Sequence, residues 1–439
     1  FFALKSKRND GHKYIPDLYK RGVRNFVVSD LPQDLNGYED ANFLQLPHPL
    51  KGLQRLAEKH RERFDVPVIG ITGSNGKTIV KEWLYQLLSP ERIITRSPRS
   101  YNSQIGVPLS VWLMNESTEL GIFEAGISEM GEMEALKNII RPSIGVLTNI
   151  GGAHQENFYS VEDKCIEKLA LFKDCDVVIY DGDNELISRC ISKSLFSARE
   201  IAWSRKDSER PLYIESVAKE VSSTTVRYRY LGMPNAYTIP FIDDASIENS
   251  LHCLAVSLYL MLPAEKITER MSSLEPVAMR LEVKEGKNGC ILINDSYNSD
   301  LASLDIALDF MSRRSEDKGR KRTLILSDML ETGQTPNFLY RQVADLVHSR
   351  GIQKIIGVGE DIRSASSRFE IEKHFFQTTE ELLASELMDE FRNEVVLIKG
   401  SRAFHFDEIS DRLELKVHET ILEINLNALV YNLNYYRSK

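Results

Sequence analysis

Between residues 70 and 78 the chain places three glycines, a lysine and a threonine close together, in the order Gly70-Ile71-Thr72-Gly73-Ser74-Asn75-Gly76-Lys77-Thr78. Glycine lets backbone N–H groups turn toward an anion, a helix N-terminus adds positive potential, and the lysine adds a mobile charge. The Thr78 hydroxyl is a hard oxygen of the kind that Mg²⁺ accepts. This spacing predicts a loop that binds the phosphates of a nucleoside triphosphate. Its binding residues would be Gly73, Ser74, Asn75, Gly76, Lys77 and Thr78.

The elements on either side of this loop are the ones that such a site needs. Residues 66–71 form a β-branched run typical of a buried strand, and from Ile79 onward apolar residues recur at the spacing of one helix face. The stricter form of the motif has glycine where this chain has Ile71. A glycine-rich turn with a chance lysine is the alternative, but the flanking strand and helix favour phosphate binding.

Two further side chains follow predicted strands and suggest metal chemistry. Glu124 ends a strand-like run over residues 121–124, and His154 follows an apolar run over residues 144–150 and a double glycine. Open α/β sheets place ligands at the carboxyl ends of their strands, and carboxylate oxygens suit Mg²⁺. An exposed strand-end glutamate and a structural histidine are the alternatives that the pattern leaves open.

The whole chain has the composition of a globular protein with several domains. Its 439 residues exceed a single core, so about two to four domains are expected. Apolar residues make up 42% and charged residues 27%, and the formal net charge of −9 argues against nucleic acid as the main partner. The longest apolar run, residues 251–262, is too short to span a bilayer.

Cysteine usage and the chain start bear on location. The five cysteines, at positions 165, 175, 190, 253 and 290, show no C-x-x-C spacing, which favours reduced thiols over a zinc site or a disulfide framework. No signal peptide is visible, so a cytoplasmic location is expected. The chain begins at Phe1 without methionine, and we expect a fragment whose N-terminal segment is missing.

Periodicity along the chain predicts α/β units and one antiparallel stretch. Residues 1–62 read as a small α/β piece that ends in a polar-faced helix over residues 54–63. Short alternating runs between residues 200 and 242 predict antiparallel strands, and a helix begins near Ile247. From about residue 276 the alternation predicts a second doubly wound domain. Its expected strands cover residues 291–293, 323–326, 354–358 and 395–398.

The form G-x-x-G-x-x-G-K-T over residues 70–78 resembles the Mur ligase family, whose members join amino acids or peptides to a carboxylate at the expense of ATP. Asp10-Gly11-His12 and Asp295-Ser296-Tyr297-Asn298 resemble its MurF branch in particular. The resemblance implies an α/β fold with three-domain Mur ligase architecture. The domains would be a truncated N-terminal UDP-sugar-binding domain (1–63), a central P-loop ATP-binding domain (64–277) and a C-terminal Rossmann-like domain (278–417).

The resemblance also implies roles for residues near the phosphate loop. Thr78 and Glu124 would bind a first Mg²⁺, and His154 a second. Lys168 lies where the family carries a carbamylated lysine, a modification that turns a cation into an anion able to bridge metal. A lysine on an amphipathic helix is ordinarily solvated, and Lys164 competes for this assignment. The implied catalytic residues are Lys77, Glu124, His154 and Lys168.

Nucleotide contacts are implied in the same way. Asn249 matches the asparagine that faces the adenine, although by pattern alone it could simply lie near a helix start. In the family the residue at Arg280 approaches the nucleotide, that at Asp295 the ribose and that at Asn298 the base.

Substrate contacts are implied at two further places. The residues are Asn102 and Ser103 in a polar turn, and Asp328, Lys399 and Ser401 at strand ends where a dipeptide amine could be held. The chain departs from the family pattern at Ala170, where many relatives have glutamate, and at Asp300-Leu301, where asparagine-proline is usual.

The reaction implied by the resemblance is a step of peptidoglycan precursor synthesis. ATP would phosphorylate the terminal carboxylate of UDP-N-acetylmuramoyl-tripeptide, and the amine of D-alanyl-D-alanine would attack the acyl phosphate. One alternative is another Mur-type or folylpolyglutamate-type ligase. A nucleotide-binding module without ligase activity is the alternative from a different class.

The last stretch of the chain, residues 418–439, does not fit the end of a ligase. Leu422-Glu423-Ile424-Asn425-Leu426-Asn427-Ala428-Leu429, with Asn432 and Arg437, resembles the opening strand and helix of alanine racemase. We therefore expect a truncated fusion to an alanine racemase domain. An ordinary C-terminal amphipathic helix is the alternative.

Overall fold

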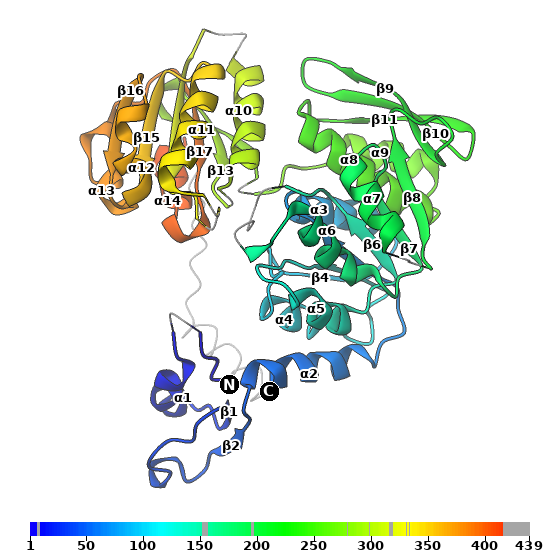
Figure 1. The fold of residues 1–439 in the computed structure, drawn as a ribbon, viewed down its shortest axis with the longest axis vertical. Coiled ribbons are helices and arrows are strands. Elements are labelled where there is room, and N and C mark those ends of the chain that lie inside the picture. The colour runs from blue at the N-terminus through cyan, green and yellow to red at the C-terminus, as the bar shows by residue number, and fades with distance from the viewer. Residues whose placement is uncertain are drawn as a thin grey trace, which may run out of the picture.

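The computed structural model describes residues 1–6, 9–151, 157–194, 197–278, 280–297, 299–315, 319–330, 332 and 334–415. Within these residues the chain forms three α/β units in sequence order, built around sheets of two, nine and six strands (Figure 1). The predicted α/β architecture of three units is confirmed. In the described part of the chain, no helix is long and apolar enough to cross a membrane.

The first unit is small. Its strands β1 (Asn25–Val28) and β2 (Asn42–Gln45) pair in parallel, and α1 (Ile15–Lys20) packs on them through Ile15. The buried core consists of Ala3, Ile15, Phe26 and Val28. The backbone N–H of Gly11 donates to the Leu4 carbonyl at 2.8 Å, so the turn formed by Asp10, Gly11 and His12 is held against this core.

The helix α2 (Pro49–Arg61) connects the first unit to the second (Figure 1). It packs against α4 (Gly106–Val111) and α5 (Glu132–Ile140) of the second unit. The buried guanidinium of Arg61 donates to the Ile140 carbonyl at 2.9 Å. The helix begins earlier than predicted, at Pro49, because proline is well suited to the first helical turn. The C-terminal half of α2 is therefore fixed to the second unit.

The second unit is built on a sheet with strand order β11-β10-β9-β8-β7-β6-β3-β5-β4. Strands β3 to β8 pair in parallel, whereas β9, β10 and β11 pair antiparallel, which confirms the antiparallel stretch predicted between residues 200 and 242. The strands are β3 (Val68–Thr72), β4 (Ile94–Arg96), β5 (Leu120–Glu124), β6 (Ile144–Leu147), β7 (Val177–Asp181), β8 (Arg199–Ser204), β9 (Leu212–Lys219), β10 (Thr224–Tyr230) and β11 (Met233–Ile239).

Helices cover both faces of this sheet. One face packs against α3 (Lys77–Leu88), α8 (Asp244–Tyr259) and α9 (Ala264–Ser272). The other packs against α4, α5, α6 (Val161–Leu169) and α7 (Glu185–Lys193). The predicted apolar face of α3 is buried through Val80, Trp83, Leu84, Leu87 and Leu88. Each such side chain contributes roughly 2 kcal/mol of burial, so α3 is fixed directly after the phosphate loop.

The position of β3 explains where a ligand can bind. β3 lies between β5 and β6, and the chain runs from β3 to β4 and β5 on one side before it crosses to β6 on the other. The carboxyl end of β3 is therefore a topological switch point, where open α/β sheets form a ligand crevice. The phosphate loop and the ends of β5 and β6 meet at this point.

The third unit has a six-stranded sheet of order β12-β13-β17-β14-β15-β16, in which only β12 is antiparallel to its neighbour. The strands are β12 (Glu282–Glu285), β13 (Ile291–Asp295), β14 (Lys321–Ser327), β15 (Lys354–Val358), β16 (Glu372–Phe376) and β17 (Glu394–Lys399). The helices are α10 (Leu301–Ser315), α11 (Pro336–Ser349), α12 (Glu360–Ser364), α13 (Thr379–Leu383) and α14 (Asp407–Leu413). The four predicted strands are confirmed, whereas β12 and β16 were not predicted.

Candidate active site

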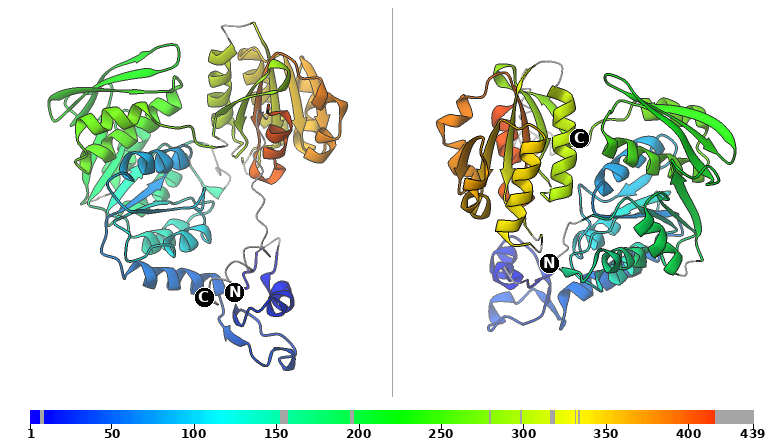
Figure 2. Two further views of the ribbon diagram at one scale, coloured as in Figure 1. Left: turned by 180° about the vertical axis from the view of Figure 1, so that it is seen from behind. Right: turned by 45° about the horizontal axis from the view of Figure 1, so that its top comes forward.

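Except for Asn298, which lies outside the described residues, the predicted nucleotide-binding residues of the second and third units line one cavity of about 600 Å³. In all three views of the structure, the second and third units lie side by side, and the first unit lies beyond the N-terminal end of α2 (Figures 1 and 2). The second unit lines the cavity with its phosphate loop, α8 and the turn after β4, and the third unit lines it with the ends of β13 and β17. The cavity is large enough for a nucleotide-sized ligand.

The phosphate loop has a backbone that requires glycine at two positions. Gly73 has φ +145° and Gly76 has φ +81°, both in the region that L side chains rarely adopt. A Cβ atom at Gly73 would collide with the Thr148 hydroxyl, and one at Gly76 with the side-chain oxygen of Asn249. The loop is thus packed directly against the end of β6 and against α8.

The segment after β6 holds the loop in shape. The N–H of Ser74 donates to the Asn149 carbonyl at 2.8 Å, and the N–H of Asn75 donates to the Asn149 side-chain oxygen at 2.9 Å. The N–H of Gly151 donates to the Ser74 hydroxyl at 2.8 Å. Asn149 therefore shapes the loop through both its backbone and its side chain.

Lys77, the first residue of α3, lies over the loop. Its Nζ donates to the carbonyl of Gly73 at 2.7 Å and to that of Ser74 at 3.0 Å. Burial lowers the pKa of Lys77 to about 8. The two hydrogen bonds hold the Lys77 side chain at the loop, where the sequence predicts that it binds phosphate.

Thr78 and Glu124 meet as predicted. The Thr78 hydroxyl donates to Glu124 Oε2 at 3.1 Å, and the Asn102 side-chain amide donates to the same oxygen at 3.3 Å. Glu124 is fully buried at the end of β5. Its other oxygen, Oε1, lies 3.2 Å from the Lys81 ammonium but has no hydrogen-bond partner in the described part of the chain. The structure thus places a carboxylate and a hydroxyl side by side under the phosphate loop.

Lys168 and Lys164 approach the loop from α6, whose N-terminus is capped by Ser160. Lys168 Nζ donates to the Gly73 carbonyl at 3.2 Å, and Lys164 Nζ donates to the Gly151 carbonyl. Burial, together with the neighbouring Lys77 and Lys164 cations, lowers the pKa of Lys168 well below its usual value. Burial lowers the pKa of Lys164 to about 8. Both candidate lysines are therefore at the loop.

Magnesium ligation is only partly covered by the described residues. No group of three or more histidine, cysteine, aspartate or glutamate side chains placed to hold a metal ion occurs among them. His154, the predicted second metal ligand, lies outside the described residues, and Asn298 does too. Their roles stay predictions.

Helix α8 contributes its first turns to the cavity. Asn249 is buried, lines the cavity and lies against Gly76. Its neighbour Glu248 also lines the cavity, and burial raises the pKa of that carboxyl to about 7. Further along, His252 is fully buried, with Nε2 3.0 Å from the Thr148 carbonyl and Nδ1 accepting from the Trp203 indole at 3.3 Å. α8 is thus fixed to β6 behind the loop.

The third unit brings several predicted residues to the opposite wall. Arg280 lies over the ring of Tyr297, 4.0 Å from its centroid. Lys399 Nζ pairs with Asp295 Oδ2 at 2.9 Å, so the end of β17 is linked to the end of β13. Ser401 lines the cavity, and its buried hydroxyl has no hydrogen-bond partner among the residues that the structure describes. Arg280, Asp295, Lys399 and Ser401 are therefore brought together at the cavity.

The remaining residues predicted to bind substrate differ in whether they line the cavity. Asn102 and Ser103 line the cavity. Asp328 instead accepts hydrogen bonds from the N–H groups of Asp361 and Ile362, at 3.1 and 2.8 Å, and from a tyrosine hydroxyl at 3.1 Å. Both of its oxygens are used in holding the start of α12. Its contact with a substrate stays a prediction.

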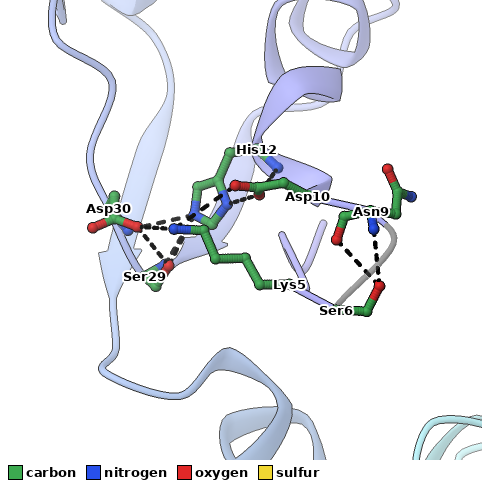
Figure 3. A network of polar contacts seen from close by, with 7 residues as sticks. All are labelled: Lys5, Ser6, Asn9, Asp10, His12, Ser29 and Asp30. Atoms are coloured by element: carbon green, nitrogen blue, oxygen red, sulfur yellow. Dashed lines mark hydrogen bonds and ion pairs between the residues drawn. The ribbon is translucent and has the colours of Figure 1, made fainter.

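A separate polar cluster lies in the first unit, around the Asp-Gly-His turn (Figure 3). His12 Nε2 accepts from the Ser29 N–H at 3.1 Å, and His12 Nδ1 lies 2.6 Å from Asp10 Oδ1. Because a backbone N–H can only donate, the proton of the neutral ring is on Nδ1. Lys5 Nζ pairs with Asp30 at 2.5 Å beside this ring. The turn is thus part of an ordered polar surface.

Sequence reasoning missed several residues at the site, Glu248 among them. Lys81 is fully buried beside Glu124, Asn149 shapes the loop, and Asp300 lines the cavity. A signal existed for Lys81, because a lysine lies among the apolar residues of one helix face. Asn149 is an ordinary residue by pattern, since its partners lie more than seventy positions earlier in the chain.

Comparison with known proteins agrees with this geometry. Residues 71–257 match the Mur ligase middle domain, and residues 279–402 match the Mur ligase, glutamate ligase domain. A UDP-N-acetylmuramoyl-tripeptide–D-alanyl-D-alanine ligase of Bacillus subtilis is 27% identical over 420 residues, which cover 93% of this chain and 89% of the relative. The ligase of the same name from Escherichia coli is 24% identical over 421 residues, covering 94% and 90%.

Solved structures show the same fold. MurF from Acinetobacter baumannii has a TM-score of 0.77 at 20% identity and covers 94% of this chain and 89% of its own. MurF from Thermotoga maritima in complex with ADP has a TM-score of 0.76 at 21% identity, covering 94% and 93%. The two domain matches together span well over half of the sequence, in the order that the three-unit fold requires, and the chain belongs to the Mur ligase family.

Proposed function

We propose that the chain is an ATP-dependent, ADP-forming ligase that adds D-alanyl-D-alanine to UDP-N-acetylmuramoyl-tripeptide in peptidoglycan precursor synthesis. The observation that carries this proposal is the cavity in which the phosphate loop faces the ends of β13 and β17. Relatives with this name align with the chain over about nine-tenths of their length, from 89% to 91% in three of them.

The phosphate loop binds and orients the triphosphate. The loop places backbone N–H groups and the N-terminus of α3 at one end of the cavity, and both attract phosphate oxygens. Lys77 Nζ is held at the loop carbonyls and can turn from them to a phosphate oxygen. Fixed positive charge at this place stabilises the charge that develops as the γ-phosphoryl group moves to the tripeptide carboxylate.

Magnesium fits the residues below the loop. Glu124 Oε1 is a buried carboxylate oxygen that lies 3.2 Å from the Lys81 ammonium and has no hydrogen-bond partner among the described residues, and the Thr78 hydroxyl lies next to the same carboxylate. Both are hard oxygen donors of the kind that Mg²⁺ prefers. When bound, Mg²⁺ supplies charge neutralisation on the phosphoryl oxygens. Thr78 and Glu124 would hold a first ion, and His154 a second.

We assign carbamylation to Lys168. A carbamate forms when a neutral amine attacks CO₂ and releases a proton. Burial and the neighbouring cations Lys77 and Lys164 favour the neutral amine of Lys168. The product replaces a buried cation by an anion beside the phosphate loop, which relieves the repulsion among the three lysines and offers oxygen ligands to metal.

The third unit holds the acceptor side of the reaction. Lys399, paired with Asp295, and the unpartnered hydroxyl of Ser401 face the cavity opposite the phosphate loop. They would orient the dipeptide so that its amine attacks the acyl phosphate. A wall contributed by each unit keeps water from that intermediate, which hydrolysis would otherwise destroy.

The first unit and the C-terminal segment complete the proposal. The Asp10–His12 cluster would hold the UDP-sugar end of the tripeptide substrate. Residues 418–439 lie outside the described residues, and only their sequence similarity supports a start of an alanine racemase domain. Mass spectrometry of the natural gene product would decide whether a racemase follows.

The direct test is ATP-dependent coupling, followed by mass spectrometry of the product. The chain is incubated with ATP, Mg²⁺, UDP-N-acetylmuramoyl-tripeptide and D-alanyl-D-alanine. The expected product is the UDP-linked pentapeptide, formed with one ADP for each amide bond. A panel of single amino acids and glutamate-bearing folates serves as the control. Phosphate release stimulated by one of these, and not by the dipeptide, would contradict the proposed substrate.

A further inference from the structure

Lys81 is a buried charge that the reaction described above does not use. It lies one helical turn after Lys77 in α3, on the side of the helix that packs into the unit, and it is 0% exposed. The neighbouring positions Val80, Trp83 and Leu84 are apolar and buried. A lysine in such surroundings is costly unless its charge is paired and its hydrogen bonds are made.

The Lys81 ammonium has four partners. It lies 2.9 Å from Glu82 Oε1 and 3.2 Å from Glu124 Oε1, and it donates to the carbonyl of Ser97 at 2.8 Å and to that of Arg99. Glu82 is in turn bound by Arg96 at 3.0 Å. The charge is therefore fixed from several directions.

These contacts bear on how the Glu124 carboxylate is oriented. Its Oε2 is held by the Thr78 hydroxyl and the Asn102 amide, and its Oε1 faces Lys81. With two hydrogen bonds at Oε2 and an ion pair at Oε1, the carboxylate has one preferred orientation about its terminal bond. The only cation within ion-pairing distance of Glu124 in the described residues is Lys81, so this lysine sets the direction of Oε1.

We propose that Lys81 is a positioning residue that fixes the Glu124 carboxylate in the orientation in which it meets Mg²⁺ beside the phosphate loop. The inference rests on the metal-binding part of the proposed function. A lysine that only joins α3 to the segment after β4, through Ser97 and Arg99, is the structural alternative. The two roles differ in whether Lys81 acts through Glu124.

The test measures metal binding directly. Mn²⁺ affinity is measured by electron paramagnetic resonance in the presence of β,γ-imido-ATP, for the wild type, Lys81→Met, Glu124→Gln and the double variant. Loss of a residue that orients a metal ligand typically lowers metal affinity about 10–100-fold, and this loss is expected for Lys81→Met. In the Glu124→Gln background the same change should lower affinity less than about twofold, because the group it orients is gone.

Controls separate this role from general stability. Lys137→Met removes another largely buried lysine of the same unit, paired at 3.0 Å with Glu134 and 3.2 Å with Asp174, and should leave Mn²⁺ affinity within about twofold. Affinity for β,γ-imido-ATP in EDTA should be unchanged in Lys81→Met. If Lys81→Met does not fold, Lys81→Gln, which removes the charge but keeps donors toward Ser97, is measured in its place, with the same loss expected.

Three results of the Mn²⁺-binding experiment would contradict the proposal. The positioning role would be overturned if Mn²⁺ affinity is unchanged in Lys81→Met. It would also be overturned if the fold-loss of affinity in the double variant equals the product of the losses in the two single variants, or if Lys137→Met loses as much affinity as Lys81→Met. The measurement needs no peptide substrate. A chain that shows the expected cycle but forms no UDP-linked pentapeptide would therefore overturn the proposed ligation and leave the role of Lys81 standing.

Discussion

At the scale of single residues, the phosphate loop is surrounded by lysines that differ in their chemical state. Lys77 and Lys168 both donate to the Gly73 carbonyl, at 2.7 and 3.2 Å, so two amines share one oxygen. Two full positive charges so close together repel each other, and burial strengthens the effect. Burial and the neighbouring Lys77 and Lys164 cations lower the pKa of Lys168 well below its usual value, so Lys168 favours the neutral amine.

Lys77→Ala should abolish phosphate release while the fold is kept. The charge that stabilises the moving phosphoryl group is lost, and removal of one such group typically slows the reaction about 100-fold or more. ADP formation measures the loss and circular dichroism measures the fold. Lys59→Ala on the exposed face of α2, where the side chain is 57% exposed, is the control. Substantial remaining ATP turnover would remove Lys77 from its assigned role.

Lys168→Ala should also be inactive, since no carbamate can form. Added bicarbonate should not restore activity, whereas short carboxylic acids such as acetate are expected to restore part of it. A ¹³C-bicarbonate NMR spectrum should show a carbamate carbon in the wild type and in Lys164→Ala, but not in Lys168→Ala. A signal that disappears with Lys164 instead would transfer the assignment to that lysine.

At the scale of elements, the site depends on where helices begin and on what holds them. α3 and α5 both begin after a left-handed glycine, Gly76 with φ +81° and Gly131 with φ +83°. Of these two glycines, only Gly76 has a neighbour among the described residues, Asn249 of α8, in the space that a Cβ would fill. α8 is tied to β6 through His252. The phosphate loop is thus fixed by α8 as well as by its own strand and helix.

This pair of glycines allows a matched experiment. Gly76→Ala and Gly131→Ala should each destabilise the protein by about 1–2 kcal/mol, because alanine is strained in the left-handed region. Gly76→Ala should in addition weaken nucleotide binding at least about tenfold, equivalent to about 1.4 kcal/mol, since Asn249 must move. Calorimetric titration with β,γ-imido-ATP measures the difference. Equal affinities in the two variants would show that the contact with α8 does not shape the site.

His252 predicts a pH dependence of stability. Burial lowers the pKa of His252 to about 4, whereas an unfolded histidine titrates near 6.5. Between these values the unfolded chain binds a proton that the folded chain does not, so stability is lost as pH falls from about 6.5 to about 4, by up to about 3 kcal/mol. The pH dependence of Tm should be shallower in His252→Gln. Equal slopes in both proteins would contradict the burial argument.

Comparison of the predicted and observed strands shows which elements can be recognised from the sequence. Runs of buried β-branched residues predicted β3, β13, β14, β15 and β17, because both faces of these strands are covered. β12 and β16 were missed because Glu282–Glu285 and Glu372–Phe376 are edge strands with charged residues, and tertiary pairing defines them. Local motifs predicted Lys77, Thr78 and Glu124. Asn149 acts through partners distant in sequence, which no local pattern reveals. The place of Lys81 among apolar residues of a helix face indicated that it is buried, but not that it pairs with Glu124.

At the scale of the whole molecule, the cavity belongs to two units at once. The phosphate loop lies on one wall, and Arg280, Asp295 and Lys399 lie on the other. Neither unit alone can enclose a nucleotide and a peptide. A ligand that contacts both walls stabilises their approach, because binding favours the arrangement in which both sets of contacts are made.

Hydrogen exchange can follow this coupling. With β,γ-imido-ATP at about 100 times its Kd, the binding-competent state gains about 2.7 kcal/mol. Slower amide exchange is expected at the phosphate loop and also at the carboxyl ends of β13 and β17 in the third unit. The distant edge strand β16 should exchange as before and serves as the internal reference. Protection confined to the second unit would mean that the third does not contact the nucleotide.

The helix α2 acts as a spacer of fixed length between the first and second units. It is 13 residues long, or about 20 Å at 1.5 Å per residue, and its C-terminal half is fixed to the second unit. The distance between the first unit, which we propose holds the UDP-sugar, and the phosphate loop therefore varies little. A substrate anchored at its nucleotide end must stretch across that gap to present its carboxylate. Each missing amino acid shortens an extended peptide by about 3.5 Å. The length of α2, which lies away from the phosphate loop, would therefore select precursors by the length of their peptide.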